Sequence, residues 1–181
     1  MQAAADGGRL PSFVGGNGVR ILVVSDTHGN YELLHQVVKA AGPVDLLLHA
    51  GDGSNDQTKL AQDFPGYSLA AVAGNCDPFS TRPRELLLTV GGQRLFLTHG
   101  DRYQVKWDLL RLFLAGKERG ANLIVFGHTH CPLIKYEQGI LLFNPGSLSR
   151  NNTGENPSYG LLELGPDGCQ PKLVFVEKNK K

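Results

Sequence analysis

Residues 20–30 read Arg-Ile-Leu-Val-Val-Ser-Asp-Thr-His-Gly-Asn, a short apolar run that ends in polar side chains and a glycine. The apolar part is nearly continuous rather than alternating, which is typical of a strand covered on both faces. Residues 30–41 follow, with Tyr31, Leu34, Val38 and Ala41 at helical spacing. Similar apolar runs occupy residues 44–49, 68–73 and 122–126. Repetition of strand, helix and strand predicts right-handed crossovers and a mostly parallel sheet.

The second half of the chain has a different pattern. Residues 86–90 and 94–98 flank Gly91-Gly92, and residues 133–137 and 140–143 flank Gln138-Gly139, so each pair predicts a β-hairpin. Two further strands are expected near residues 159–164 and 172–177. We therefore expect an α/β fold with two packed, mixed β-sheets and helices on the outside.

A second helix is expected over residues 105–119. Its pattern places Trp107, Leu110 and Leu114 on one side and stops at Gly120, a residue type that commonly follows a helix.

Length and composition favour one globular domain. The chain has 181 residues, of which 41% are hydrophobic and 19% charged, with a formal net charge of +1. No long basic stripe indicates stable nucleic-acid binding, and no apolar run approaches the roughly 18 residues needed to cross a bilayer. Residues 1–18 lack the pattern of a secretory signal, so we expect a disordered leader there and a single domain over residues 19–178. Three cysteines without a paired spacing favour reduced thiols and a cytoplasmic location.

Polar residues follow five of the apolar runs, each beside a glycine. In an open α/β sheet, ligands bind beyond the carboxyl ends of the strands, so these five segments are expected to converge. They contain the following candidates: Asp26 and His28; Asp52; Asn75, Cys76 and Asp77; His99; and His128 and His130.

Four of the six histidines belong to these segments. His35, within the first helix, is expected to be a packing residue, and His49, inside a strand, a supporting or core residue. Chance would not place His28, His99, His128 and His130 all at strand ends beside glycines.

The residue types suit a pair of metal ions. Asp26 and His28 are two positions apart in extended chain, so their side chains lie on the same face and can bind one ion. Imidazole and carboxylate ligands without a thiolate cluster suit Mn, Fe, Zn or Ni. Asp52 could bridge two cations about 3.5–4 Å apart, and Asn75 offers a neutral oxygen. Two ions would activate a water and neutralise phosphoryl charge during in-line attack on phosphorus, without a Ser or Cys nucleophile.

These motifs, in this order, resemble the calcineurin-like metallophosphoesterase superfamily: Asp-x-His, Gly-Asp, Gly-Asn-x-Asp, His-Gly and Gly-His-x-His. The resemblance spans residues 20–164. Its Gly-Asn-Cys-Asp form and Asn144-Pro145-Gly146-Ser147 are most similar to the YfcE-type phosphodiesterase branch. It implies a four-layer sandwich and a dinuclear centre in which manganese is favoured.

The resemblance also implies a role for each ligand. Asp26, His28, Asp52 and His130 would hold the first ion, whereas Asp52, Asn75, His99 and His128 would hold the second. We accordingly expect Asp52, Asn75 and His99 to serve in catalysis. It further implies a phosphodiester or nucleotide substrate and a homodimer or homotetramer.

One position departs from the superfamily, because many members carry His where this chain has Cys76. A thiol carries no imidazolium charge, so we expect diesters, or esters with good leaving groups, rather than demanding monoesters. Cys76 is a candidate substrate contact or a space-filler, and not a nucleophile. Arg102 and Arg150 are candidate phosphate contacts, with solvated surface residues as the alternative. Asp77 is expected to orient its neighbours.

Two alternative functions stay open, and a third is disfavoured. One is a phosphomonoesterase or nucleotide pyrophosphatase of the same superfamily. Another is an interaction module without catalysis, similar to a retromer subunit with a degraded metal site, although every ligand position is filled here. A dinucleotide-binding oxidoreductase is disfavoured because no Gly-x-Gly-x-x-Gly follows the first strand.

Overall fold

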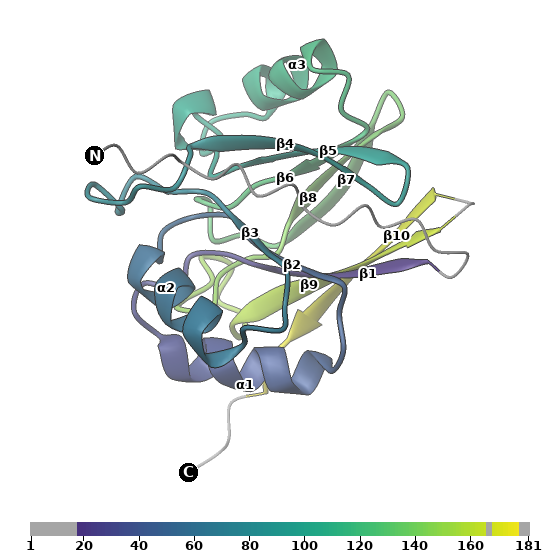
Figure 1. Ribbon diagram of the computed structural model, residues 1–181. Helices are drawn as coiled ribbons and strands as arrows, with labels where there is room; N and C mark the ends of the chain where they lie inside the picture. Colours follow the sequence, from purple (N-terminus) through teal and green to yellow (C-terminus); the bar gives the residue numbers. More distant parts are fainter. Residues whose placement is uncertain (1–17, 166–167, 178–181) are drawn as a thin grey trace, which may run out of the picture.

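The computed structural model describes residues 18–165 and 168–177, which form two five-stranded β-sheets (Figure 1). The first sheet has the order β10-β9-β1-β2-β3. Within it, β1 pairs in parallel with β2, β2 pairs in parallel with β3, and β9 runs antiparallel to both β1 and β10. Its strands are β1 (Val19–Val24), β2 (Leu46–His49), β3 (Leu69–Ala71), β9 (Ser158–Gly165) and β10 (Gly168–Phe175).

The second sheet has the order β4-β5-β6-β8-β7. The three central strands are parallel, and the two edge strands join them as antiparallel hairpins. Its strands are β4 (Glu85–Val90), β5 (Gln93–Thr98), β6 (Leu123–Val125), β7 (Leu133–Glu137) and β8 (Ile140–Asn144).

Side chains between the two sheets form the central core, which includes Ile21, Leu48, Leu97 and Phe143. Helices α1 (Tyr31–Ala41) and α2 (Ser54–Asp63) lie on the outer side of the first sheet, where α1 and α2 residues such as Leu34 and Leu60 pack. Helix α3 (Leu110–Glu118) covers the outer face of the second sheet. Figure 1 shows these four layers, with α3 and the α1–α2 pair at opposite ends of the view. The expected α/β fold of two packed mixed sheets flanked by helices is confirmed.

The topology positions the functional segments. Strands β1, β2 and β3 are mutually parallel, and so are β5, β6 and β8. Carboxyl ends of parallel strands lie at one edge of a sheet, so the loops that follow β1, β2, β3, β5 and β6 gather at one end of the molecule.

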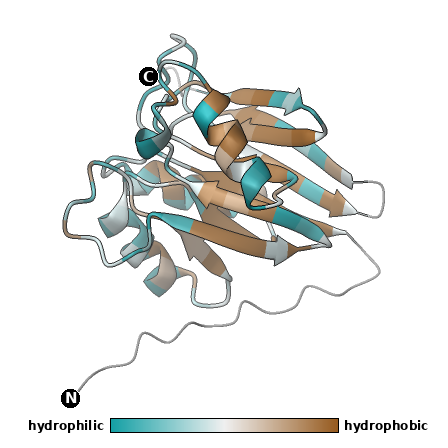
Figure 2. Ribbon diagram, turned by 90° about the horizontal axis from the view of Figure 1, so that it is seen from above, coloured by the Kyte–Doolittle hydropathy of each residue, from teal (hydrophilic) through white to brown (hydrophobic). Residues whose placement is uncertain are grey.

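The helix expected over residues 105–119 is shorter than predicted, and its buried side is different. Residues 101–103 form a 3-10 turn, Gln104 has a φ of 56°, and α3 begins only at Leu110. The left-handed residue stops a continuous helix. Trp107 is 88% exposed, and Leu110 and Leu114 are 60% and 52% exposed. The buried residues of α3 are instead Leu112, Phe113 and Gly116. In Figure 2 the ribbon of this helix carries both apolar and polar segments.

Two other differences concern α2 and the chain ends. Helix α2 was not expected from the sequence, because the segment is mostly polar and buries a single leucine, Leu60. Residues 1–17 of the expected leader, and residues 166–167 and 178 of the expected domain, lie outside the described residues. Within the part of the chain that the structure describes, no helix has the length and hydropathy needed to cross a membrane.

Candidate metal centre

The loops after the five strands meet as expected and are bonded to one another through their backbones. Asp26 N donates to Gly51 O at 3.0 Å, and His28 N donates to Asp52 O at 3.1 Å, which joins the loops after β1 and β2. Gly127 N donates to His99 O at 3.1 Å, which joins the loops after β5 and β6. His128 N donates to Asp26 Oδ2 at 3.0 Å, and Cys76 N donates to Asp52 Oδ1 at 2.7 Å, so all five loops meet at one place.

Three of the expected ligands form a first cluster. Ligand atoms of Asp26, His28 and His130 all lie within 4.8 Å of one another. Asp26 Oδ1 is 3.1 Å from His130 Nε2 and 3.9 Å from His28 Nε2. The two imidazole Nε2 atoms are 3.2 Å apart. This spacing would allow one ion to contact all three side chains.

Asp52, His99 and His128 form a second cluster within the same 4.8 Å limit. His99 Nε2 lies 3.3 Å from Asp52 Oδ2 and 3.2 Å from Asn75 Oδ1, so the amide oxygen of Asn75 also faces this cluster. The ring of His128 packs against that of His99, with centroids 5.0 Å apart.

Asp52 connects the two clusters. Its Oδ2 is 3.3 Å from His99 Nε2 in the second cluster and 3.8 Å from His28 Nε2 in the first. Its Oδ1 accepts a hydrogen bond from Cys76 N at 2.7 Å. The side chain is buried, so the carboxylate has a fixed position between the two groups of ligands.

Backbone strain is concentrated in these residues. Among the described residues, seven non-glycine residues have a positive φ. Five of these seven are expected metal ligands: Asp26, His28, Asp52, His128 and His130. Such a conformation costs free energy for residues that have a Cβ, and it persists where the surrounding structure holds it for function. The strain turns each side chain towards the common centre rather than along the strand.

Hydrogen bonds select the imidazole tautomer at two positions. His99 Nδ1 lies 2.7 Å from Ala50 O, and His130 Nδ1 lies 2.9 Å from Arg150 O. A carbonyl oxygen only accepts, so in each ring Nδ1 carries the proton and donates it. When these rings are neutral, Nε2 presents its lone pair to the centre, as metal ligation requires.

A buried network around His49 supports the first loop. His49 Nδ1 accepts hydrogen bonds from Gly51 N at 3.2 Å and Gln57 Nε2 at 3.1 Å. His49 Nε2 faces Thr27 Oγ1, which donates to Asp56 Oδ2 at 2.6 Å. Burial lowers the pKa of His49 to about 4, so this ring is neutral near pH 7. His49 is a supporting residue, as expected from the sequence, whereas its partners in α2 were not predicted.

Asp77 joins two other loops. Its carboxylate accepts hydrogen bonds from Ser54 N at 2.9 Å, Gly74 N at 2.9 Å and Gly53 N at 3.1 Å. These bonds hold the backbone just after Asp52 and just before Asn75. The expectation that Asp77 orients its neighbours is confirmed.

Opposite charges in the centre shift several pKa values. Burial would raise the pKa of Asp52, but the hydrogen bond and charge of His99 hold it below its usual range. Burial also opposes the lowered pKa of Asp26, which arises from His130 and His99. In return, the nearby carboxylate of Asp26 raises the pKa of His130, and Asp52 raises that of His99 against the effect of burial. Without a metal, protons neutralise this cluster of carboxylates.

A cavity of about 180 Å³ lies beside two of the expected ligands, His28 and Asp52, and Cys76 also lines it. Cys76 is exposed, and its Sγ accepts a hydrogen bond from Asn75 Nδ2 at 3.3 Å. Although Cys76 is exposed, the protein removes part of the water around its thiol. This partial desolvation, followed by the neighbouring Asp52, raises the pKa of Cys76 to about 11. A neutral thiol is a poor nucleophile, which agrees with the expectation from sequence.

Two expected phosphate contacts are less well placed. Arg102 and Arg150 are exposed, and within residues 18–165 and 168–177 neither guanidinium bonds to an expected ligand. Arg150 contributes to the site through its backbone oxygen, which holds His130.

The residues fit a metal on the grounds of their own chemistry. Asp26 Oδ1 is buried and, among the described residues, has no hydrogen bond of acceptable geometry, although three imidazole Nε2 atoms lie 3.1–4.0 Å away. Such an oxygen is costly to bury without a partner, and a cation would satisfy it. The donors are carboxylate, imidazole and amide groups, a set that suits divalent transition metals.

Comparison with known proteins agrees with this geometry. The sequence profile of the calcineurin-like phosphoesterase superfamily domain matches residues 19–167. The chain is 35% identical over 164 residues to the probable metallophosphoesterase YsnB of Bacillus subtilis, covering 90% of this chain and 94% of that protein. It is 30% identical over 170 residues to the phosphodiesterase YfcE of Escherichia coli, covering 80% and 88% of the two chains.

Solved structures show the same fold. A conserved Streptococcus pneumoniae protein described as a predicted phosphoesterase superimposes with a TM-score of 0.71 at 25% identity, covering 87% of this chain and 98% of the other. Vps29 of Cryptosporidium parvum superimposes with a TM-score of 0.67 at 19% identity, covering 90% of this chain and 100% of the other, a likeness of fold alone.

Proposed function

Because the chain belongs to the calcineurin-like phosphoesterase superfamily, we propose that it is a phosphodiesterase that depends on two divalent metal ions. The observation that carries this proposal is the position of Asp52 between two clusters of ligands, within 3.3 Å of His99 Nε2 and 3.8 Å of His28 Nε2. A carboxylate in that position suits a bridge between two ions.

Each cluster would hold one ion. Asp26, His28, Asp52 and His130 would hold the first, and Asp52, Asn75, His99 and His128 the second. When bound, such ions supply Lewis acidity and lower the pKa of a coordinated water. Manganese is our expectation for the ion, with iron, nickel and zinc able to replace it, because the ligand set discriminates little among first-row metals.

The residues of the chain have separate tasks. Asp26 and Asp52 supply negative charge that neutralises the ions, and the Nδ1–H bonds of His99 and His130 keep their rings oriented. Asn75 adds an oxygen without adding charge, so the centre retains a net positive charge for a phosphate group. The cavity beside Cys76 is open to solvent and would admit the ester.

Cys76 supports diesters over monoesters. Its thiol is neutral and therefore adds no positive charge for a phosphate dianion, whereas a diester carries only one negative charge. The similarity to a phosphodiesterase from Escherichia coli supports the same choice. A phosphomonoesterase or nucleotide pyrophosphatase is the second candidate.

A module without catalysis, like the retromer subunit, is the other alternative. The fold likeness to Vps29 motivates it, but the complete and strained ligand set of this chain favours an enzyme. A location in the cytoplasm and assembly into a dimer or tetramer stay predictions.

The proposal is tested with metal-free protein loaded with manganese. We expect hydrolysis of bis-p-nitrophenyl phosphate to exceed that of p-nitrophenyl phosphate, and to stop when a chelator is added. Manganese binding without hydrolysis of either ester would favour the interaction module. Faster hydrolysis of the monoester would favour the second candidate.

A further inference from the structure

A cavity of about 470 Å³ lies next to the candidate metal centre. Its apolar walls include Val105, Leu109, Phe126 and Leu133, and a few polar groups stand at its rim. Ligand sites in proteins are typically about 300–1,000 Å³, mostly apolar, with a small number of polar groups. This cavity has the dimensions and lining of such a site.

The cavity and the metal centre share one loop. Thr129, in the cavity wall, lies between His128 and His130 in the chain. Asn152, also in the wall, donates from its Nδ2 to Thr129 O at 2.8 Å and from its backbone N to His130 O at 2.9 Å. A group bound in the cavity would therefore lie at a fixed position relative to His130.

Trp107 lies in the lining of this cavity, although it is 88% exposed. It is the single tryptophan of the chain. Exposing an indole to water is unfavourable, and tryptophan is enriched where it contacts a ligand or partner. An indole also stacks on flat aromatic rings of any substituent pattern. Its position beside the metal centre suits recognition of a ring attached to a phosphate.

Lys106 adds a positive charge beside this aromatic face. It lines the same cavity. The same lining also contains Asp108, so the cavity offers a cation and a carboxylate beside its aromatic face.

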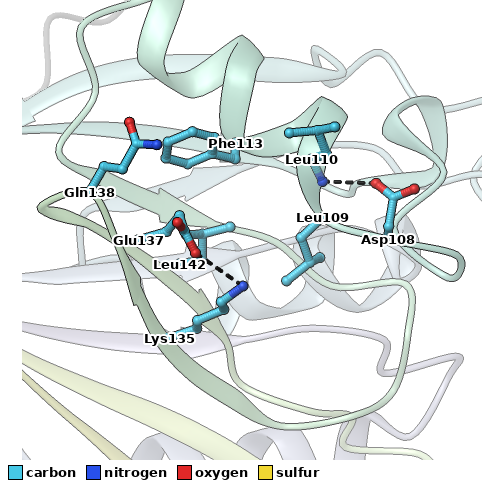
Figure 3. A pocket seen from close by; sticks show the side chains of 8 residues that line it. All are labelled: Asp108, Leu109, Leu110, Phe113, Lys135, Glu137, Gln138 and Leu142. Carbon is cyan, nitrogen blue, oxygen red and sulfur yellow. Dashed lines mark hydrogen bonds and ion pairs between the residues drawn. The ribbon is translucent and has the colours of Figure 1, made fainter.

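A second cavity, of about 350 Å³, provides a contrast (Figure 3). It lies between α3 and the β7–β8 hairpin, and its lining contains none of the expected metal ligands or their loop residues. Lys135 and Glu137 pair with each other across its wall at 3.3 Å, so these charges are already neutralised. Nothing in it points to a phosphoester.

We propose that the cavity beside Trp107 is the subsite for the organic arm of the substrate, and that it binds a planar aromatic group, a nucleobase above all, stacked on the indole. The substrate class is thus an aromatic, nucleotide-like phosphoester. This inference rests on the proposed function in one respect, namely that the phosphate of the substrate binds at the metal centre.

Binding can be tested without turnover, because Trp107 is the only indole. In the manganese-loaded protein, excitation at the red edge of the indole band avoids the five tyrosines. We expect adenosine monophosphate to quench the emission in a saturable manner, and ribose 5-phosphate, which lacks the base, to have little effect. Phenyl phosphate distinguishes a general aromatic site, which would quench, from one restricted to nucleobases. Equal effects of adenosine monophosphate and ribose 5-phosphate would overturn the proposal.

Variants give a second readout by isothermal titration calorimetry. Trp107→Leu should weaken adenosine monophosphate binding by at least about fivefold, the lower range for lost base stacking, and leave ribose 5-phosphate binding unchanged. Trp107→Phe should restore most of the affinity. Tyr136→Leu is the matched control, because Tyr136 is an exposed aromatic outside this cavity lining. Equal weakening of both ligands in Trp107→Leu would contradict the subsite. Lack of ester hydrolysis with intact base selectivity would instead contradict the proposed function alone.

Discussion

The backbone N–H of Cys76 donates a hydrogen bond of 2.7 Å to Oδ1 of Asp52. This bond fixes one carboxylate oxygen and leaves Oδ2 facing His99 and His28. The loop after β3 thus orients the residue at the end of β2 that we propose as the bridge. The geometry of the whole centre depends on this carboxylate.

Asp52→Asn should reduce both metal binding and activity. The amide retains the shape of the side chain but loses the negative charge between the two clusters. We expect bound manganese to fall below two ions per chain and kcat to fall by roughly 100-fold or more. Elemental analysis and steady-state kinetics measure these effects. Asp63→Asn is the control, because Asp63 is exposed and bonds to Tyr31 instead. Full metal content in Asp52→Asn would contradict the bridge.

His49→Gln should weaken metal binding although His49 is no ligand. The substitution disturbs the hydrogen bonds to Gly51, Gln57 and Thr27 that hold the first two loops. We expect about 1–3 kcal/mol lower unfolding free energy and a loss of metal affinity of about 10–100-fold. Urea denaturation and metal titration measure the two effects. His35→Gln in α1, where the ring only packs on Tyr31 and Phe64, should leave metal affinity unchanged.

Gly127→Ala should displace Asp26. A Cβ at Gly127 would lie 2.0 Å from Ser25 Oγ and 2.7 Å from Asp26 Oδ2, closer than packed atoms allow. We expect weaker manganese binding and a lower Tm, measured by metal titration and thermal unfolding. Gly66→Ala is the matched control, since its Cβ would meet no atom within 4 Å. Equal metal affinity in the two variants would show that Asp26 does not depend on this contact.

Stabilisation by manganese should increase with pH. The pKa values of His99 and His130 are raised by Asp52 and Asp26, so in metal-free protein their contribution to stability is complete below about pH 6.5 and is lost as pH rises through the folded pKa. Asp26 and Asp52 have lowered pKa values, so their contribution to stability does not change with pH above about pH 5. Manganese would replace the imidazole protons. The increase in the Tm of the protein on adding manganese should therefore be larger near pH 8 than near pH 6. A constant gain would show that no imidazole proton is displaced.

Cys76→His should extend activity towards monoesters. An imidazole at this position could carry positive charge beside Asp52 and the phosphate, which a neutral thiol does not supply. We expect the ratio of p-nitrophenyl phosphate to bis-p-nitrophenyl phosphate hydrolysis to increase. Cys76→Ser, which adds no charge, should leave that ratio unchanged. No gain of monoesterase activity in Cys76→His would remove the role we give to this position.

The sequence was most informative where apolar runs end in polar residues beside glycine. Periodicity predicted the central strands, and the strand ends predicted which side chains would meet, as for Asp26, Asp52 and His99. The ligand roles depended on family resemblance, because spacing alone does not say whether His128 and His130 share one ion. The structure places them in different clusters.

Other features depend on tertiary contacts that periodicity does not register. Helix α2 is mostly polar, yet Asp56 and Gln57 are buried. Asp56 accepts hydrogen bonds from Thr27 and Gly29 of the first loop, and Gln57 donates to Val72 O and His49 Nδ1. The apolar spacing of residues 105–119 suggested a longer helix, but the left-handed Gln104 interrupts it and leaves Trp107 beside a cavity. The sequence placed Trp107 on the apolar side of that longer helix, so its exposure beside the cavity could not be predicted from periodicity.

The most direct test of the dinuclear centre is manganese content at saturation, measured on metal-free protein together with the rate of bis-p-nitrophenyl phosphate hydrolysis. The account predicts two ions per chain, with full activity only when both are bound. Saturation at one ion per chain, or full activity with one, would contradict the two-ion centre bridged by Asp52.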